Sequence, residues 1–185
     1  ISTDRMTHYK ANFVPKIALY EPDIPQNTAA IIRTCACLGA ELEIIEPCGF
    51  LISDKRFKRV VMDYMDDKKI KIYQSSEDFF KAKSDQRVIL ITTKAKKIYT
   101  DFKFKINDTL LFGKESAGVP KKVHKILKQK IKIPMIAKKR SLNLSTSVAI
   151  ILREMQKKQK LKNLINKKKK NRQKLVYDTT RYNYQ

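Results

Sequence analysis

Short apolar runs alternate with segments of helical periodicity along most of the chain. The apolar runs predict strands over residues 16–20, 41–45, 70–73, 87–93, 109–112 and 130–135. Helical spacing predicts helices over residues 26–38, 55–65 and 76–83, from Pro120, and from Asn143 onward. Ser76 and Asn143 are the candidate N-caps, and Leu144, Val148, Ile151 and Met155 form the apolar face of the last helix. This alternation predicts an α/β fold with a mostly parallel sheet.

Both ends of the chain differ from this alternating core, which we place at residues 16–156. Residues 1–15 are an N-terminal extension, and we set residues 1–5 aside because Ile1 is not an initiator and Met6 is a better natural start. Residues 157–185 hold 11 basic residues and one acid, and include the run Lys167–Lys170. We expect this segment to extend the last helix and to fade into a mobile basic arm.

The overall charge narrows the class of partner. Lys and Arg number 41 against 18 Asp and Glu, so the formal net charge is +23, which favours nucleic acid ahead of an anionic membrane. No run of about 18 apolar residues predicts a membrane span. No basic and apolar leader opens the chain, and three cysteines form no disulfide framework, so we expect a cytoplasmic protein. Two histidines and the lack of a CxxC argue against a zinc site.

Two of the four glycines, Gly113 and Gly118, stand in one stretch between a predicted strand and a predicted helix. Open parallel sheets bind ligands beyond the carboxyl ends of their strands, which is where this stretch lies. One interpretation is therefore a ligand-binding loop that needs close backbone approach. The alternative is an ordinary strand-to-helix turn. The stretch is not a Walker loop, because Asp108 stands where that pattern requires its first glycine, and no GxGxxG occurs.

Two further polar clusters follow predicted strands. Residues 21–27 (EPDIPQN) lead into a helix that bears Arg33, and residues 140–147 (RSLNLSTS) lead into the last helix. The backbone N–H groups of that last helix start could hold an anion, while plain capping is the alternative. Asn27 and Arg33 are candidates for a pocket as well. The alternative for Asn27 is a simple N-cap, and the alternative for Arg33 is a solvated charge on the helix surface. His124 is interpreted as a surface residue, and no Ser/His/Asp group or carboxylate pair is visible.

The three clusters, in this order after three strands, resemble the SpoU (TrmH-like) class of the SPOUT methyltransferases. The matching segments are IALYEPDIPQNTAAIIRTCACLGAELEIIEPCGF (17–50), ITTK (91–94), LLFGKESAGVP (110–120) and IKIPMIAKKRSLNLSTSVAIILRE (131–154). The last two segments are typical of the class. The EPxIPxNT opening and the IEPxGF ending of the first are typical of the subgroup that modifies the wobble nucleotide of tRNA.

The resemblance implies a SPOUT α/β domain with helices on both faces of the sheet and a deep trefoil knot in its C-terminal part. Such a knot would be a rare exception among proteins. The resemblance also implies a homodimer that transfers a methyl group from S-adenosylmethionine, without a metal, to the ribose 2′-OH of cytidine or uridine 34 in a tRNA anticodon stem-loop. The cofactor contacts then map onto Ile91, Gly113, Ile133 and Ser141.

The resemblance assigns the chemistry to four polar residues. Arg33 matches the motif arginine that is often taken as a base, but a guanidinium has a pKa above about 12 and keeps its proton. We therefore expect a charged Arg33 to stabilise the developing alkoxide and to hold a neighbouring phosphate. Asn27, Glu115 and Asn143 match the remaining polar positions and are expected to shape the pocket, with Glu115 a candidate partner for a guanidinium.

Some features depart from the subgroup and leave other functions open. Ala29 and Ala30 stand where Gly-Asn is usual, and Arg153 stands near the place of a common aromatic residue. The segment 157–185 has no counterpart in the minimal enzyme, and its charge predicts salt-sensitive phosphate contacts, with a passive solubilising tail as the alternative. Two other functions remain: a SpoU-class enzyme for another tRNA position or for rRNA, and a non-catalytic basic RNA-binding module.

Overall fold

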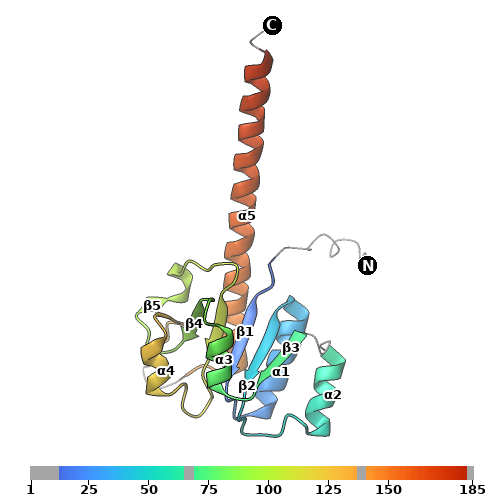
Figure 1. Cartoon of the computed structure of the whole chain (residues 1–185), viewed down its shortest axis with the longest axis vertical. Coiled ribbons are helices and arrows are strands. Elements are labelled where there is room, and N and C mark those ends of the chain that lie inside the picture. Colours follow the sequence, from blue (N-terminus) through green and yellow to red (C-terminus); the bar gives the residue numbers. More distant parts are fainter. Residues whose placement is uncertain (1–12, 65–68, 137–140, 183–185) are drawn as a thin grey trace.

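A seven-stranded sheet forms the centre of the molecule, which the computed structural model describes over residues 13–64, 69–136 and 141–182 (Figure 1). The strand order is β3-β2-β1-β6-β4-β7-β5, and all the pairings among these residues are parallel. The strands are β1 (Lys16–Tyr20), β2 (Glu41–Ile45), β3 (Ile70–Tyr73), β4 (Val88–Ile91), β5 (Lys97–Ile98), β6 (Thr109–Phe112) and β7 (Gln129–Lys132). The predicted α/β class and parallel sheet are confirmed.

Helices cover both faces of the sheet, which explains why the central strands are apolar at almost every position. Successive strand side chains point to opposite faces. Ile17 and Leu19 belong to a core with α1 (Pro25–Leu38), α2 (Lys55–Tyr64) and α5 (Leu144–Tyr182). Ala18 and Tyr20 belong to a second core with α3 (Ser76–Ala82) and α4 (Lys121–Ile126).

Most helix ends lie where the sequence predicts them. Helix α1 ends at Gly39, whose φ of 71° is the left-handed conformation that glycine adopts without strain. Helix α4 starts directly after Pro120, and α5 starts directly after Asn143. The predicted cap of α3 is wrong by one residue: Ser75, not Ser76, is the N-cap, and its hydroxyl accepts a hydrogen bond from the backbone N–H of Asp78.

Other elements differ from the prediction in length. Strands β4 and β7 end at Ile91 and Lys132, before the predicted ends at residues 93 and 135. Strand β5 and the 3-10 turn η3 (Tyr99–Asp101) were not predicted, because elements of two or three residues are too short to show a period. The link from β7 to α5 includes residues 137–140, which lie outside the described residues, so the trefoil knot stays a prediction.

Helix α5 crosses the whole height of the sheet. It begins beside the carboxyl ends of the strands, and twelve residues later the side-chain amide of Gln156 donates to the carbonyl of Leu38, at 2.7 Å, near the amino end of β2. The helix then continues beyond the fold to Tyr182 (Figure 1). The extension predicted for the last helix is therefore helical as far as Tyr182, and the mobility expected of its end stays a prediction.

Candidate functional site

A pocket of about 470 Å³ lies at the carboxyl ends of β1, β4, β6 and β7. Four loops meet there because the strands are parallel and all end at the same edge of the sheet. Three of these loops carry the polar clusters that the sequence singled out. The lining residues used below are Asn27, Ile91, Phe112, Gly113, Glu115, His124, Ile133, Ser141, Asn143 and Leu144.

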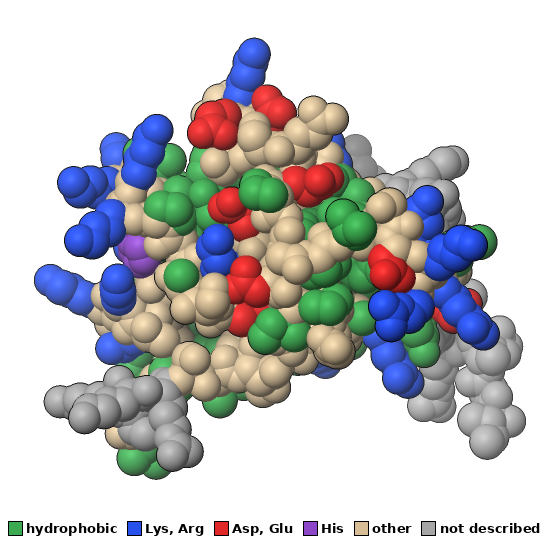
Figure 2. All heavy atoms as spheres, turned by 90° about the horizontal axis from the view of Figure 1, so that it is seen from below, with side chains coloured by type: hydrophobic (Ala, Val, Ile, Leu, Met, Phe, Trp, Pro, Cys, Tyr) green, Lys and Arg blue, Asp and Glu red, His purple; other side chains and the backbone are tan. Residues whose placement is uncertain are grey.

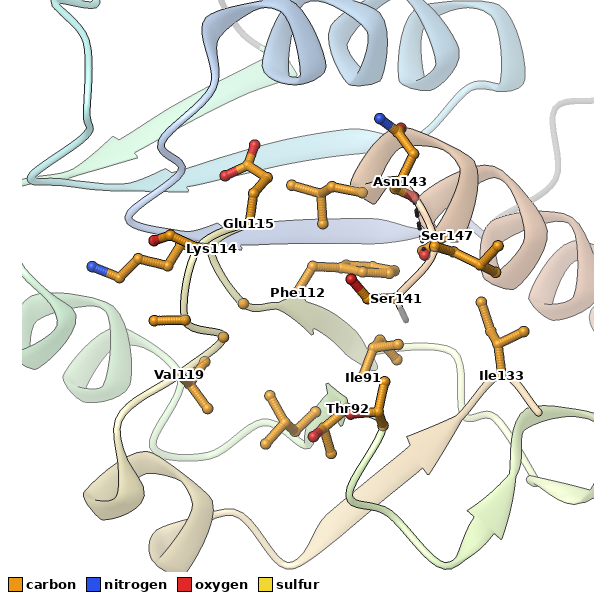
Figure 3. Close-up of a pocket in the computed structure, with 18 of the residues that line it drawn as sticks. Ile91, Thr92, Phe112, Lys114, Glu115, Val119, Ile133, Ser141, Asn143 and Ser147 are labelled. Carbon is orange, nitrogen blue, oxygen red and sulfur yellow. Dashed lines mark hydrogen bonds between the residues drawn. The ribbon is translucent and has the colours of Figure 1, made fainter. Parts of the chain in front are cut away.

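The four residues predicted to contact the cofactor all line this pocket. Ile91 ends β4, Gly113 follows β6, and Ile133 follows β7, so three neighbouring strands place them together. Ser141 precedes α5 and faces the same space (Figure 3). Phe112 and Leu144 complete an apolar wall of the pocket, against which a planar aromatic group could pack.

The loop after β6 closes tightly on itself. Lys114 and Gly118 form an antiparallel bridge in which each backbone N–H donates to the other residue's carbonyl, at 3.2 and 2.8 Å. A Cβ atom on Gly113 would lie 2.6 Å from both Cα and C of Gly118. Glycine is therefore required at 113 for close approach of the loop to its own backbone, and the resulting turn forms one side of the pocket.

Two acidic residues fasten this turn to the loop after β1. The backbone N–H and the hydroxyl of Ser116 both donate to Asp23 Oδ2, and these hydrogen bonds lower the pKa of the Asp23 carboxyl. In the opposite direction, the Asp23 backbone N–H donates to Glu115 Oε2 at 2.8 Å. Each loop thus holds the other, which fixes the position of Glu115 at the pocket.

Asn27, Glu115 and Asn143 form one hydrogen-bonded chain along the pocket wall. Asn143 Nδ2 donates to Asn27 Oδ1 at 2.9 Å, and Asn27 Nδ2 donates to Glu115 Oε1 at 3.3 Å. Asn27 lies inside α1 and is not its N-cap, which is Ile24. Asn143 also caps α5, because its Oδ1 accepts from the backbone N–H groups of Ser145 and Thr146. These three residues, far apart in sequence, are brought together as the resemblance implied.

Arg33 is the one predicted site residue that does not line the pocket of its own chain. It is exposed on α1, and its guanidinium lies 5.3 Å from the ring centroid of Tyr64 on α2. Six residues separate it from Asn27, which corresponds to about 240° around a helix. The two side chains therefore leave α1 in different directions. Glu115 accepts from Asp23 and Asn27, and pairs with no guanidinium within the described part of the chain.

His124 is at the pocket although the sequence interpretation placed it on the surface. It lies half-buried on α4, and burial, followed by the nearby cations Lys94 and Lys130, lowers its pKa. The imidazole is therefore neutral at pH 7. Its lysine-rich helix gave no apolar pattern that would have indicated this position.

Cys48 lies beside the acidic side of the site but is not a nucleophile. Burial first, and then the carboxylates of Glu46, Glu21, Glu115 and Asp23, raise the pKa of its thiol to about 12. The reactive thiolate is therefore almost absent at neutral pH. No group of three His, Cys, Asp or Glu that could hold a metal occurs in the described residues. The described helices include none that is long and apolar enough to span a membrane.

Basic side chains flank the edge of the sheet that holds the pocket. Figure 2 views the molecule from this edge and shows lysine and arginine gathered on two opposite sides, over α4 and over α2. The cations on these helices are Lys121, Lys122 and Lys125 on α4, and Lys55, Arg56, Lys58 and Arg59 on α2. Acidic and apolar side chains lie between them (Figure 2). A polyanion that crosses this face would meet cations on both sides of the pocket.

Residues 15–153 match the model of the SpoU rRNA Methylase family, and the chain belongs to this family. A tRNA (cytidine(34)-2′-O)-methyltransferase from Beijerinckia indica is 45% identical over 140 residues, which cover 75% of this chain and 88% of the relative. The corresponding enzyme of Escherichia coli K12 is 40% identical over 140 residues, which cover 75% of this chain and 89% of that enzyme.

Two solved structures share the fold. One, described as giving structural insights into the 2-OH methylation of C/U34 on tRNA, matches with a TM-score of 0.73 at 33% identity and covers 80% of this chain and 97% of that chain. The other is an AdoMet-bound rRNA methyltransferase from Sinorhizobium meliloti, with a TM-score of 0.69 at 23% identity over 78% of this chain and 56% of that chain. The resemblance to SpoU methyltransferases is confirmed.

Proposed function

We propose that this protein transfers the methyl group of S-adenosylmethionine to the ribose 2′-oxygen of cytidine or uridine at the wobble position of tRNA. The observation that carries the proposal is the hydrogen-bonded chain of Asn143, Asn27 and Glu115 along the wall of a pocket that also offers the apolar side chains of Ile91, Phe112 and Ile133. Asn27 belongs to the segment that resembles the wobble-nucleotide subgroup, Glu115 and Asn143 belong to segments typical of the whole class, and relatives named for the wobble specificity match three quarters of the chain. We propose that the protein acts in the cytoplasm.

The pocket suits a cofactor with an aromatic base at one end and a charged amino acid at the other. Ile91, Phe112 and Ile133 offer apolar surface for the base. The closed turn at Gly113–Gly118 and the start of α5 present backbone N–H and carbonyl groups. When bound, S-adenosylmethionine supplies a methyl group on a positively charged sulfur, a leaving group that needs no further activation.

The chain's own residues then position the ribose and stabilise its oxygen. The ribose 2′-hydroxyl would be the acceptor of that methyl group and would give up its proton to solvent. The amides of Asn27 and Asn143 line the pocket, where they can orient the ribose by hydrogen bonds. A cation beside the 2′-oxygen favours its loss of a proton, and Arg33, permanently charged, is our candidate for that role.

Because Arg33 is outside the pocket of its own chain, we propose a homodimer in which a second copy brings its Arg33 to the first copy's pocket. Helix α1 contributes Asn27 to the pocket and exposes Arg33 about 9 Å further along its axis. In a twofold interface the same surface packs on both copies. A contact made through α1 therefore places each arginine near the other subunit's site.

Two measurements test the proposed activity. We expect titration calorimetry to show one S-adenosylmethionine site per chain, and labelled methyl groups to pass to bulk tRNA as 2′-O-methylated cytidine or uridine. If methyl groups pass to rRNA fragments and none pass to tRNA, the assignment of the cofactor stands and the assignment of tRNA as the substrate is contradicted. Failure to bind the cofactor would contradict the enzyme assignment and favour a non-catalytic RNA-binding module.

A further inference from the structure

The last part of α5 is a basic arm, which we define as residues 161–182. Every side chain from 161 to 174 is exposed. This stretch holds seven cations and no acid: Lys162, Lys167, Lys168, Lys169, Lys170, Arg172 and Lys174. The arm lies beyond the family match, which ends at residue 153. It is therefore an addition to the methyltransferase fold and not a part of its core.

The arm leaves the fold on the side opposite to the pocket. Leu144, the first residue of α5, lines the pocket, whereas Gln156 already contacts the end of α1 at the amino edge of the sheet. At a rise of 1.5 Å per residue, Lys167 lies about 35 Å and Lys174 about 45 Å from Leu144 along the helix axis. Figure 1 shows the arm projecting away from the edge where the strands end.

The seven cations between residues 161 and 174 repel one another, and no acid stands among them in the sequence. Lys168 and Arg172, and Lys170 and Lys174, are spaced four residues apart, where like charges destabilise a helix. Among the described residues, no salt bridge involves any of the arm's cations; the last on α5 joins Lys158 to Glu154. A polyanion would relieve this repulsion, and the released counterions would favour binding.

We infer that the basic arm is an RNA-binding site that holds phosphates of the substrate far from the nucleotide in the pocket. The inference rests on the proposed function for the identity of the RNA. A membrane surface fits less well, because an interfacial helix needs a long apolar face. Here the apolar residues Leu161, Leu164 and Ile165 lie at the base of the arm, and Leu175, Val176 and Tyr177 follow only after the eight residues 167–174, which contain none, so the apolar positions are interrupted along the arm.

The distance makes the arm's contribution depend on the length of the RNA. A full tRNA can extend from the pocket to the arm, whereas an isolated anticodon stem-loop seated at the pocket of the same chain cannot. The test variant replaces Lys167, Lys168, Lys169 and Lys170 with Gln. Its matched control replaces four exposed lysines of the core, Lys71, Lys81, Lys103 and Lys105, with Gln and so removes the same charge.

Binding is measured by fluorescence anisotropy, without cofactor, for a full tRNA transcript and for its anticodon stem-loop over a range of KCl concentrations. Four successive lysines point around the helix, so roughly two can face one phosphate backbone. We therefore expect the arm variant to bind full tRNA about tenfold more weakly and to lower the slope of log K against log salt by about 2. For the stem-loop we expect no change, and the control should weaken binding of both RNAs equally and slightly.

Equal losses on both RNAs would place the arm at the pocket and overturn the inference, as would no loss on either. Binding to anionic phospholipid vesicles that the arm variant loses, with tRNA affinity intact, would assign the arm to a membrane instead. The assay does not involve methyl transfer. A length-dependent effect in a protein that fails to methylate the wobble nucleotide would therefore contradict the proposed function while leaving the arm's role in place.

Discussion

Gly113 shows how a single residue determines the shape of the pocket. A Cβ atom at this position would lie 2.6 Å from the backbone of Gly118, so Gly113→Ala must displace the closed turn. We expect the variant to bind S-adenosylmethionine at least about tenfold more weakly, equivalent to about 1.4 kcal/mol. Titration calorimetry gives this affinity directly.

Gly39 provides the matched control for that variant. It has a φ of 71°, and a Cβ there would have no heavy atom within 4 Å. Gly39→Ala should lower the free energy of unfolding by about 1 kcal/mol through backbone strain alone. Cofactor affinity should remain that of the wild type. Equal losses of affinity in the two variants would show that general destabilisation, and not the turn, is responsible.

Asn143 has two functions that substitution can separate. Its Oδ1 caps α5, and its Nδ2 donates to Asn27. Asn143→Ala removes the cap and the hydrogen bond to Asn27. It should lower the free energy of unfolding by about 1 kcal/mol and also reduce methyl-transfer activity. Asn143→Asp keeps the capping oxygen and loses the donor, so we expect near-normal stability with a reduced kcat. Thermal unfolding and methyl-transfer kinetics measure the two effects, and normal turnover in the Asp variant would exclude a role for the donor.

Between elements, a buried ion pair joins β2 to the end of α3. Lys83 Nζ lies 2.7 Å from Glu43 Oε1, and their side chains are only 5% and 9% exposed. The Tyr73 hydroxyl donates to the same Glu43 oxygen at 3.2 Å. Lys83→Met leaves the carboxylate buried without its cation, which should lower the free energy of unfolding by about 3 kcal/mol.

The double variant Glu43→Gln/Lys83→Met distinguishes the pair from general packing. It removes the buried charge entirely, so we expect it to recover most of the stability lost by Lys83→Met alone. Urea denaturation provides both values. If the double variant is as unstable as the single one, the loss comes from packing of the Lys83 stem and not from the unpaired charge.

The sequence predicted the long elements because burial imposes a period on them. Strand β4 has four consecutive apolar residues because both of its faces are buried. Helix α5 has apolar residues at intervals of 4, 3 and 4 because only one of its faces is buried in the fold. Strand β5 was not predicted because two residues show no period. The full length of α5 was not predicted because residues 167–174 lack an apolar face, and local propensity alone maintains the helix there.

Across the whole molecule, the proposed homodimer makes a prediction about sharing of active sites. Arg33→Ala and Gly113→Val should each be inactive alone, the first for lack of the cation and the second for lack of a pocket. Random exchange makes half of the dimers mixed, and each mixed dimer has one complete site. Mixing should therefore restore about a quarter of wild-type methyl transfer. No restoration, with mixed dimers detected by mass spectrometry, would place Arg33 in the site of its own chain.

The site was only partly predictable from sequence, and tertiary geometry explains the difference. Ile91, Gly113 and Ile133 follow strands, so a parallel sheet brings them to one edge. The contact between Asn27 and Asn143 joins residues 116 apart, and only the motif resemblance connected them. The direction of Arg33 depends on how α1 packs, and its proposed partner site depends on a second copy. His124 had no local signal at all.

The most direct test of the proposed activity is the location of the transferred methyl group. Bulk tRNA methylated with labelled S-adenosylmethionine is digested to oligonucleotides and sequenced by mass spectrometry, with Gly113→Ala as the low-activity control. We predict a single labelled 2′-O-methyl group on cytidine or uridine at the wobble position. A label on a base, or on the ribose of any other nucleotide, would contradict the function proposed for this pocket.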